Sequence, residues 1–184
     1  ALVKQYHYTL EEVAGGSRKS AQAEDLQEKP ALLMVLETIQ DPGNLGTILR
    51  AGEGAGVTGS VMDANTADIY NPKVIRSTMG SVLRMPFVYV ENLHETLEEL
   101  KKKKIRLFAA HLQGKHAYDQ EDYTGPTAFL IGNEGNGLTE ETAAMADTYI
   151  RIPMEGRVES LNAAVAASVL MFEAARQRRN HTGK

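Results

Sequence analysis

The sequence contains no cysteine, which excludes a disulfide framework, a thiolate zinc site and a cysteine nucleophile. It also lacks long apolar runs. A stretch such as Ala31 to Leu36 is far too short to cross a bilayer, and no secretory segment is visible near the start. We therefore expect a cytoplasmic protein without membrane contact. The formal net charge of −4 excludes a chain that is basic throughout, so nucleic acid would have to meet a local patch.

Two groups of basic residues offer such a patch. The first is Lys101 to Lys104, and the second comprises Arg176, Arg178 and Arg179. Cations also stabilise the C-terminal ends of helices, where they are simply solvated. The sequence leaves both interpretations open, and the solvated helix end is the simpler one.

A chain of 184 residues suits one domain with a continuous core. From residue 30 onward, short apolar strands alternate with helices, and the strands hardly alternate between apolar and polar residues. This pattern indicates an α/β fold with a mainly parallel sheet of about six strands, covered by helices on both faces. We expect strands at 31–39, 57–64, 86–90, 105–112, 127–131 and 148–153, with the strand at 86–90 buried. We expect helices at 72–83 (with Asn71 as N-cap), 44–55, 92–104, 139–146 and 160–178, and a long loop at 113–126.

The N-terminal segment differs from the rest. Residues 11–29 carry few large apolar side chains and no clear periodicity, so we interpret residues 1–29 as a linker or N-terminal arm. Residues 30–180 form the expected domain, and residues 181–184 form a tail. Because the chain opens with Ala1 rather than methionine, a missing upstream domain is an alternative that stays open.

Three loops follow predicted strands, at the edge where open α/β sheets place their ligands. They are Gln40–Asn44, Ile131–Leu138 and Ile152–Asn162. The second, "IGNEGNGL", has three glycines in six residues, so its backbone can turn sharply and approach a ligand. It lacks the Gly-Lys-Ser/Thr of a phosphate-binding loop, which favours hydrogen bonding to a nucleobase edge, with Glu134 as its only fixed charge. A tight strand-to-helix turn is the structural alternative.

The third loop leads into the last predicted helix. Ser160 is a plausible N-cap for that helix, with Asn162 just inside it. The helix is apolar nearly all round, and such a helix must be buried on both sides, which points to a subunit interface. The apolar residues are Leu161, Val165, Val169, Leu170, Met171 and Phe172.

Arg50 follows Gly46 by one helical turn, on a different face from the buried stripe. Gly46 has no side chain to cover the guanidinium. An arginine exposed in this way can clamp a phosphate or a carboxylate in bidentate fashion. The alternative is an ion pair with Glu53, three residues further on.

Taken together, the three loops closely resemble the three motifs of the SpoU (TrmH) family of RNA ribose 2′-O-methyltransferases, in the SPOUT superfamily. "DPGNLGTILR" is similar to the first motif, "LIGNEGNGL" to the second and "IPMEGRVESLNAAVAAS" to the third. The resemblance covers about Ala31 to Arg178. It implies methyl transfer from S-adenosylmethionine to a ribose 2′-hydroxyl of structured RNA, in the first place ribosomal RNA, with transfer RNA as the alternative.

The same resemblance implies a deep C-terminal trefoil knot and a homodimer with active sites at the subunit interface. It implies no metal. The cofactor-binding residues that it implies are Leu130, Ile131, Gly132, Asn133, Gly135, Ile152, Met154, Ser160, Leu161 and Asn162.

The resemblance assigns catalytic roles to Arg50, Asn44, Glu134, Ser160 and Asn162. In the family, the arginine is the proposed base or activator. Since a free guanidinium stays protonated, we expect Arg50 to grip the RNA phosphate and orient the 2′-hydroxyl. Asn44 and Asn162 would organise the loops and the substrate, Ser160 would cap the last helix and Glu134 would fix the second loop. Gly46 would clear the space in front of Arg50.

Two other functions compete with this one. A non-enzymatic SPOUT-like factor, which binds RNA or assists ribosome assembly, would have a blocked pocket or a replaced Arg50, and the sequence shows neither. A dinucleotide-dependent enzyme would need a glycine-rich turn after the first strand, which Asp41-Pro42-Gly43-Asn44 does not supply. Many relatives carry an N-terminal RNA-binding domain, of which residues 1–29 would be a remnant. We therefore expect the chain alone to bind the cofactor but to methylate RNA poorly.

Overall fold

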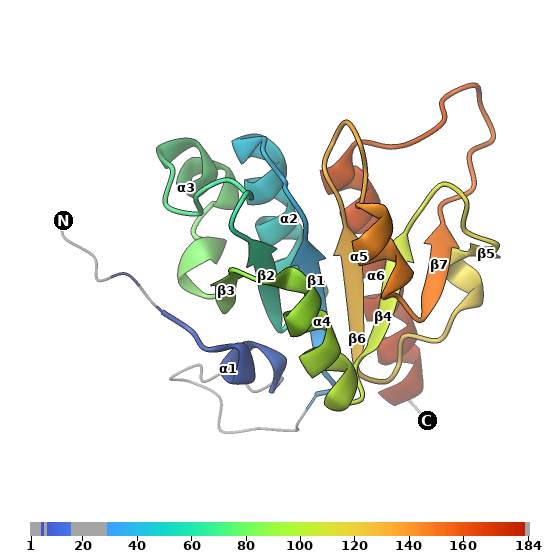
Figure 1. Cartoon of the computed structure of the whole chain (residues 1–184), viewed down its shortest axis with the longest axis horizontal. Helices are drawn as coiled ribbons and strands as arrows, with labels where there is room; N and C mark the ends of the chain where they lie inside the picture. The colour runs from blue at the N-terminus through green and yellow to red at the C-terminus, as the bar shows by residue number, and fades with distance from the viewer. Residues whose placement is uncertain (1–4, 6, 16–28, 183–184) are drawn as a thin grey trace.

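The computed structural model describes residue 5 and residues 7–15 and 29–182 (Figure 1). Its centre is a seven-stranded sheet in the order β3-β2-β1-β6-β4-β7-β5, and all neighbouring strands run parallel. This confirms the expected mainly parallel α/β fold. The strands are β1 (Leu32–Leu36), β2 (Gly59–Asp63), β3 (Phe87–Val90), β4 (Arg106–Ala110), β5 (His116–Ala117), β6 (Thr127–Ile131) and β7 (Thr148–Arg151).

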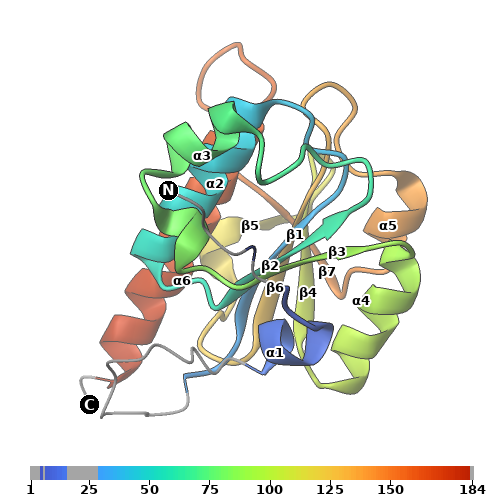
Figure 2. The same ribbon diagram turned by 90° about the vertical axis from the view of Figure 1, so that its left-hand side faces the viewer.

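The helices cover both faces of the sheet (Figure 2). On one face lie α2 (Pro42–Ala55), α3 (Pro72–Thr78) and α6 (Ala163–Thr182). On the other lie α1 (Leu10–Ala14), α4 (Leu93–Lys102) and α5 (Glu140–Ala144). Two short 3₁₀ turns, η1 (Ser81–Leu83) and η2 (Tyr118–Gln120), complete the secondary structure. No helix in the described part of the chain combines the length and the apolar character that a membrane crossing needs.

Strand β1 explains why the sequence shows an apolar run without alternation. Leu32, Met34 and Leu36 belong to the core beneath α2 and α6, whereas Leu33 and Val35 belong to the core beneath α4. All five β1 residues are buried, as are the five of β6. A strand with helices on both faces has no solvent side, so both sets of alternate positions must be apolar.

The edge of the sheet departs from the expectation. β3 is an edge strand in which Phe87 is buried and Tyr89 is exposed, so the prediction of a fully buried strand is wrong. The expected loop at 113–126 contains β5, a strand that was not expected, and the fully buried Tyr123. A strand of two residues is too short to carry a periodic signal.

Several helix boundaries also differ by a few residues, and two of these differences have a clear structural cause. The helix expected at 72–83 begins as predicted, with Asn71 as its N-cap and Pro72 first, but it ends at Thr78. Met79 and Gly80 take left-handed φ values of 50° and 90°, which stop the helix before η1. The helix expected from Ser160 starts at Ala163, so Ser160 is not its cap.

The N-terminal arm is partly folded. Thr9 and Glu12 form a capping box that starts α1, and Val13 of α1 is completely buried. A Cβ added at Gly59 of β2 would lie 2.7 Å from the Val13 side chain, so the helix packs tightly against the sheet. Within the segment expected to be a linker or N-terminal arm, Leu10–Ala14 therefore forms a packed helix. Residues 16–28 lie outside the described residues.

Most of the basic C-terminal group has a structural role. Arg178 donates hydrogen bonds to the carbonyl oxygens of Pro30, Ala31, Tyr123 and Gly125. Its burial lowers the pKa of Arg178 to about 10. Arg176 forms an ion pair with Glu173 at 2.7 Å. Arg178 therefore holds α6 against neighbouring segments and is not part of a free basic patch, whereas Arg176 pairs within α6 and its side chain stays 54% exposed.

Candidate active site

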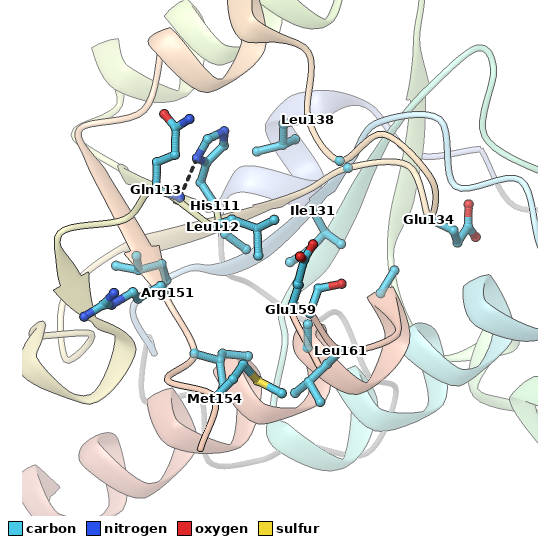
Figure 3. Close-up of a pocket in the computed structure, with 18 of the residues that line it drawn as sticks. His111, Leu112, Gln113, Ile131, Glu134, Leu138, Arg151, Met154, Glu159 and Leu161 are labelled. Atoms are coloured by element: carbon cyan, nitrogen blue, oxygen red, sulfur yellow. Dashed lines mark hydrogen bonds between the residues drawn. The ribbon is translucent and has the colours of Figure 1, made fainter. Parts of the chain in front are cut away.

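A pocket of about 710 Å³ opens at the carboxyl ends of β4, β6 and β7 (Figure 3). Loop 131–138, which follows β6, forms one wall, and the segment 150–161, which follows β7, forms another. The end of β4 and the first turns of α6 form the other walls of the pocket. Parallel strands end at the same edge of a sheet, which is why segments distant in sequence meet here.

Loop 131–138 is bonded to the loop that follows β1. The carboxylate of Glu134 accepts a hydrogen bond from Asn44 Nδ2 at 3.0 Å. It also accepts from the backbone N–H groups of Gln40, at 3.3 Å, and Asp41, at 3.1 Å. Glu134 thus connects loop 131–138 to the loop that follows β1.

The third loop joins the same network through Asn162. Asn162 Nδ2 donates to Asn44 Oδ1 at 3.0 Å, while Asn162 Oδ1 accepts from the N–H groups of Ala164 and Val165. Asn162 is therefore the residue that caps α6, in the place predicted for Ser160. Asn44 thus bonds directly to both Glu134 and Asn162, so one residue from each loop belongs to the same network.

The contacts of Glu134 also affect its ionisation. Partial burial acts to raise the pKa of Glu134, but hydrogen bonds from Asn44 and from the backbone N–H groups of Glu134, Asp41 and Gln40 outweigh it. The net result is a pKa below the ordinary value, because these donors stabilise the carboxylate form. Glu134 is therefore an anion that ties two loops together.

The glycines of the second loop permit a very close backbone approach. A Cβ at Gly132 would lie 2.1 Å from both the carbonyl carbon of Gly137 and the nitrogen of Leu138. Gly137 has a φ of 72°, and its N–H donates to the Asn133 carbonyl oxygen at 2.9 Å. The loop thus folds back on itself, and only glycine fits at position 132.

Most of the predicted cofactor residues lie at the pocket. Eight line it: Ile131, Gly132, Asn133, Gly135, Ile152, Met154, Ser160 and Leu161. Two do not line it. Leu130 is completely buried in the sheet, and Asn162 caps α6.

Arg50 lies on the exposed side of α2 and does not line the pocket. The alternative ion pair with Glu53 is not formed, because Glu53 instead binds Arg84 and Ser81. No hydrogen bond or ion pair holds the Arg50 guanidinium within the ranges that the structure describes.

The explanation predicted for Gly46 is wrong. Gly46 is buried against α3, where an added Cβ would lie 1.7 Å from Ser77 Oγ and 3.0 Å from the Val74 carbonyl oxygen. Glycine at this position lets α2 and α3 pack closely, and it does not clear the approach to Arg50. The residue that requires glycine at position 46 is Ser77 of α3, so the sequence around Gly46 could not reveal it.

A fourth segment of the pocket was not predicted. Ala110, His111, Leu112 and Gln113 follow β4, and Figure 3 shows His111 and Gln113 together on one side of the pocket. The N–H of Gln113 donates to His111 Nδ1 at 3.2 Å. This segment could have been predicted only from its position in the sheet, because β4 is a parallel strand whose carboxyl end must lie beside that of β6. Arg151 and Glu159 add opposite charges to the lining.

The chain matches a family model described as the SpoU rRNA Methylase family over residues 31–172. The 23S rRNA (guanosine-2'-O-)-methyltransferase RlmB of Xylella fastidiosa is 39% identical over 148 residues, which are 80% of this chain and 59% of that protein. RlmB of Pseudomonas syringae pv. tomato is 37% identical over 154 residues, 84% of this chain and 62% of that protein. The chain thus spans about three fifths of the length of these relatives.

Solved structures of methyltransferases are also similar to this chain. The AdoMet-bound rRNA methyltransferase from Sinorhizobium meliloti has a TM-score of 0.81 at 32% identity, over 94% of this chain and 62% of that one. The SpoU methyltransferase AviRb from Streptomyces viridochromogenes, in complex with the cofactor AdoMet, has a TM-score of 0.78 at 34% identity. The match covers 86% of this chain and 66% of AviRb.

Proposed function

This chain belongs to the SpoU rRNA methylase family, and we propose that it transfers the methyl group of S-adenosylmethionine to a ribose 2′-hydroxyl of RNA. The observation that carries the proposal is that Asn44 bonds to both Glu134 and Asn162, which links the three loops beside a pocket that the second and third loops line. The trefoil knot stays a prediction, because a sheet order alone does not report how the chain is threaded.

Ribosomal RNA is the substrate that we propose, because the matched relatives are named 23S rRNA methyltransferases. Transfer RNA is the alternative. A ribosomal RNA substrate agrees with the cytoplasmic location expected from the sequence.

The pocket fits the proposed methyl donor. Its volume of about 710 Å³ falls within the range of about 300–1,000 Å³ that is usual for pockets of small ligands. The lining combines apolar side chains such as Ile131, Met154 and Leu161 with backbone groups of the glycine-rich loop, which suits a molecule with both a flat base and polar ends. When bound there, S-adenosylmethionine would supply a methyl group on a positively charged sulfur. The carboxylate of Glu159 in the lining favours a cation, and Arg151 in the same lining offers a partner for a carboxylate.

The predicted residues then divide into two sets. The eight that line the pocket would hold the donor directly, and Ser160 would use its hydroxyl there, since it does not cap α6. Leu130 and Asn162 would act from behind the pocket wall. Leu130 is part of the rigid strand β6, and Asn162 fixes the start of α6.

We assign Arg50 to the RNA rather than to the donor. A hydroxyl group becomes an effective nucleophile only when it is held in place or loses its proton. The guanidinium remains protonated, so Arg50 would bind a phosphate in bidentate fashion and orient the neighbouring 2′-hydroxyl. Its exposed position on α2 leaves room for a polynucleotide.

A homodimer would complete this arrangement. Val165 and Phe172 on α6 are each 48% exposed, so within one chain the apolar helix α6 is covered on only one side. A Cβ at Gly54 would lie 3.9 Å from the Phe172 ring, and Gly54 follows Arg50 by one helical turn. A second subunit that covers Phe172 would therefore lie beside Arg50, which supports an active site at the subunit boundary.

Methyl transfer from radiolabelled S-adenosylmethionine to ribosomal RNA tests the proposal. We expect Arg50→Ala to abolish transfer and to leave binding of S-adenosylmethionine unchanged, and Arg50→Lys to be strongly impaired because lysine cannot bind phosphate in bidentate fashion. Thr47→Ala, also on the exposed side of α2, is the control and should retain activity. Full activity in Arg50→Ala would remove this residue from the mechanism, and a wild-type chain that binds RNA but neither transfers methyl groups nor binds S-adenosylmethionine would favour the assembly-factor alternative.

A further inference from the structure

Asp63 is a buried carboxylate outside the three loops and outside the pocket. It ends β2 and is 9% exposed. A buried charge needs hydrogen-bond donors, and Asp63 has four of them. The N–H and Oγ1 of Thr38 donate at 2.9 and 2.8 Å, and the N–H and Oγ1 of Thr66 donate at 2.9 and 2.7 Å.

Two of these bonds fix an uncommon backbone conformation. Thr38 follows β1 and has a φ of 56°, in the left-handed region that β-branched residues seldom adopt. Asp63 binds both the N–H and the hydroxyl of this residue, one through each carboxylate oxygen. The carboxylate therefore determines where the Thr38 carbonyl group points.

That carbonyl group holds the glycine-rich loop. Asn133 Nδ2 donates to the Thr38 oxygen at 2.9 Å. The other end of the Asn133 amide, Oδ1, accepts from the N–H of Gly135 at 2.8 Å and from that of Asn136 at 3.2 Å. An unbroken series of hydrogen bonds thus runs from Asp63 through Thr38 and Asn133 into loop 132–138.

We infer that Asp63 is a positioning residue, which acts through Thr38 and Asn133 to place loop 132–138 for binding of the methyl donor. This inference rests on the proposed function, because that function makes the loop a wall of the donor site. Asp63 itself touches neither the pocket nor the network of Asn44 and Asn162, so it is not a catalytic residue.

The far end of the loop has a separate anchor. The Glu37 carboxylate accepts from the N–H and Oγ1 of Thr139, both at 2.8 Å. Loss of Asp63 should therefore loosen the loop near Asn133 and leave its connection to α5 in place. This predicts a local change and not general unfolding.

Calorimetry with S-adenosylmethionine and hydrogen exchange of the peptide that covers residues 132–138 test the inference. Asp63→Asn keeps the size of the side chain but removes the charge, and we expect about tenfold weaker binding of the donor and faster exchange in the loop. Thr38→Val should reproduce both effects, whereas Thr38→Ser keeps the hydroxyl and should retain binding. Val61→Ala, a cavity variant at a buried position of the same strand, is the control for lost stability.

The outcomes separate the inference from the proposed function. If Asp63→Asn and Val61→Ala lower the unfolding temperature alike but only Asp63→Asn weakens binding and speeds exchange in the loop, the inference is supported. If wild-type binding is measurable and Asp63→Asn and Thr38→Val match it in affinity and exchange, the inference is overturned while the proposed function stands. If the wild-type chain gives no heat, the proposed function fails, and the exchange data still decide whether Asp63 positions the loop.

Discussion

The side-chain amide of Asn162 donates a hydrogen bond of 3.0 Å to the side-chain oxygen of Asn44, 118 residues earlier in the chain. Asn44 uses the other half of its amide to donate to Glu134 at 3.0 Å. One side chain thus accepts from the third loop and donates to the second. An amide can do both at once, whereas a carboxylate or a hydrocarbon cannot.

This dual role predicts a graded series of variants at Asn44. Asn44→Ala removes both bonds and should lower the free energy of unfolding by about 1–2 kcal/mol. Asn44→Asp keeps the shape but places a second carboxylate against Glu134, so we expect a larger loss at neutral pH. Urea denaturation measures both, with Thr47→Ala as the control on the same helix. An Asn44→Asp chain as stable as the wild type would show that the loops do not depend on this bond.

The lowered pKa of Glu134 predicts how stability depends on pH. Because the folded pKa lies below the unfolded one, the contribution of Glu134 is fully present above the ordinary pKa of a glutamate side chain and is lost as the pH falls through the folded pKa. Relative to the wild type, Glu134→Gln should be less stable at pH 7, and the difference should vanish at acid pH. Thermal unfolding of both chains from pH 7 to pH 3 measures this. Glu98→Gln, at an exposed position on α4, is the control, and a Glu134→Gln deficit that does not shrink as the pH falls would count against the assignment.

The close contact at Gly46 predicts opposite effects for two glycines of α2. Gly46→Ala would force its methyl group into Ser77 and should destabilise the fold by about 1–3 kcal/mol. Addition of Ser77→Gly should restore part of that loss, since it removes the nearest atoms. Gly54→Ala meets only the Phe172 ring at 3.9 Å and should be neutral or stabilising by up to about 1 kcal/mol. Equal effects at the two positions, measured by urea denaturation, would contradict the packing described for α2 and α3.

The exposed face of α6 predicts the oligomeric state. Sedimentation equilibrium should give a dimer for the wild-type chain, and Phe172→Glu should give a monomer that remains folded by circular dichroism. Phe172→Leu keeps the apolar surface and should remain dimeric. A wild-type chain that stays monomeric across the concentration range would rule out the homodimer and require another explanation for Val165 and Phe172.

Much of the fold could be predicted because its signals are local. The strand at 127–131 and the N-cap at Asn71 have the predicted positions. Leu93, Leu97 and Leu100 line the buried side of α4, and their spacing in the sequence is that of one helical face. Each of these depends on residues within one element, so the sequence alone contains the information.

The features that could not be predicted depend on contacts between distant elements. Ser160 and Asn162 are both good capping residues, and only the bond from Asn162 to Asn44 identifies the residue that starts α6. Gly46 is explained by Ser77 of the next helix. The site was recognised from its three motifs. The His111 segment has no motif and enters the pocket only because β4 lies next to β6 in the sheet.

The central claim is that the second and third loops, tied together through Asn44, Glu134 and Asn162, form a binding site for S-adenosylmethionine, and titration calorimetry tests it most directly. We predict saturable heat for the wild-type chain. Gly125→Ala should bind with unchanged heat, because its added methyl group meets nothing within 4 Å. Gly132→Ala should give no heat, because its methyl group would lie 2.1 Å from backbone atoms. Absence of heat with the wild-type chain, or binding by Gly132→Ala as tight as that of the wild type, would contradict the claim.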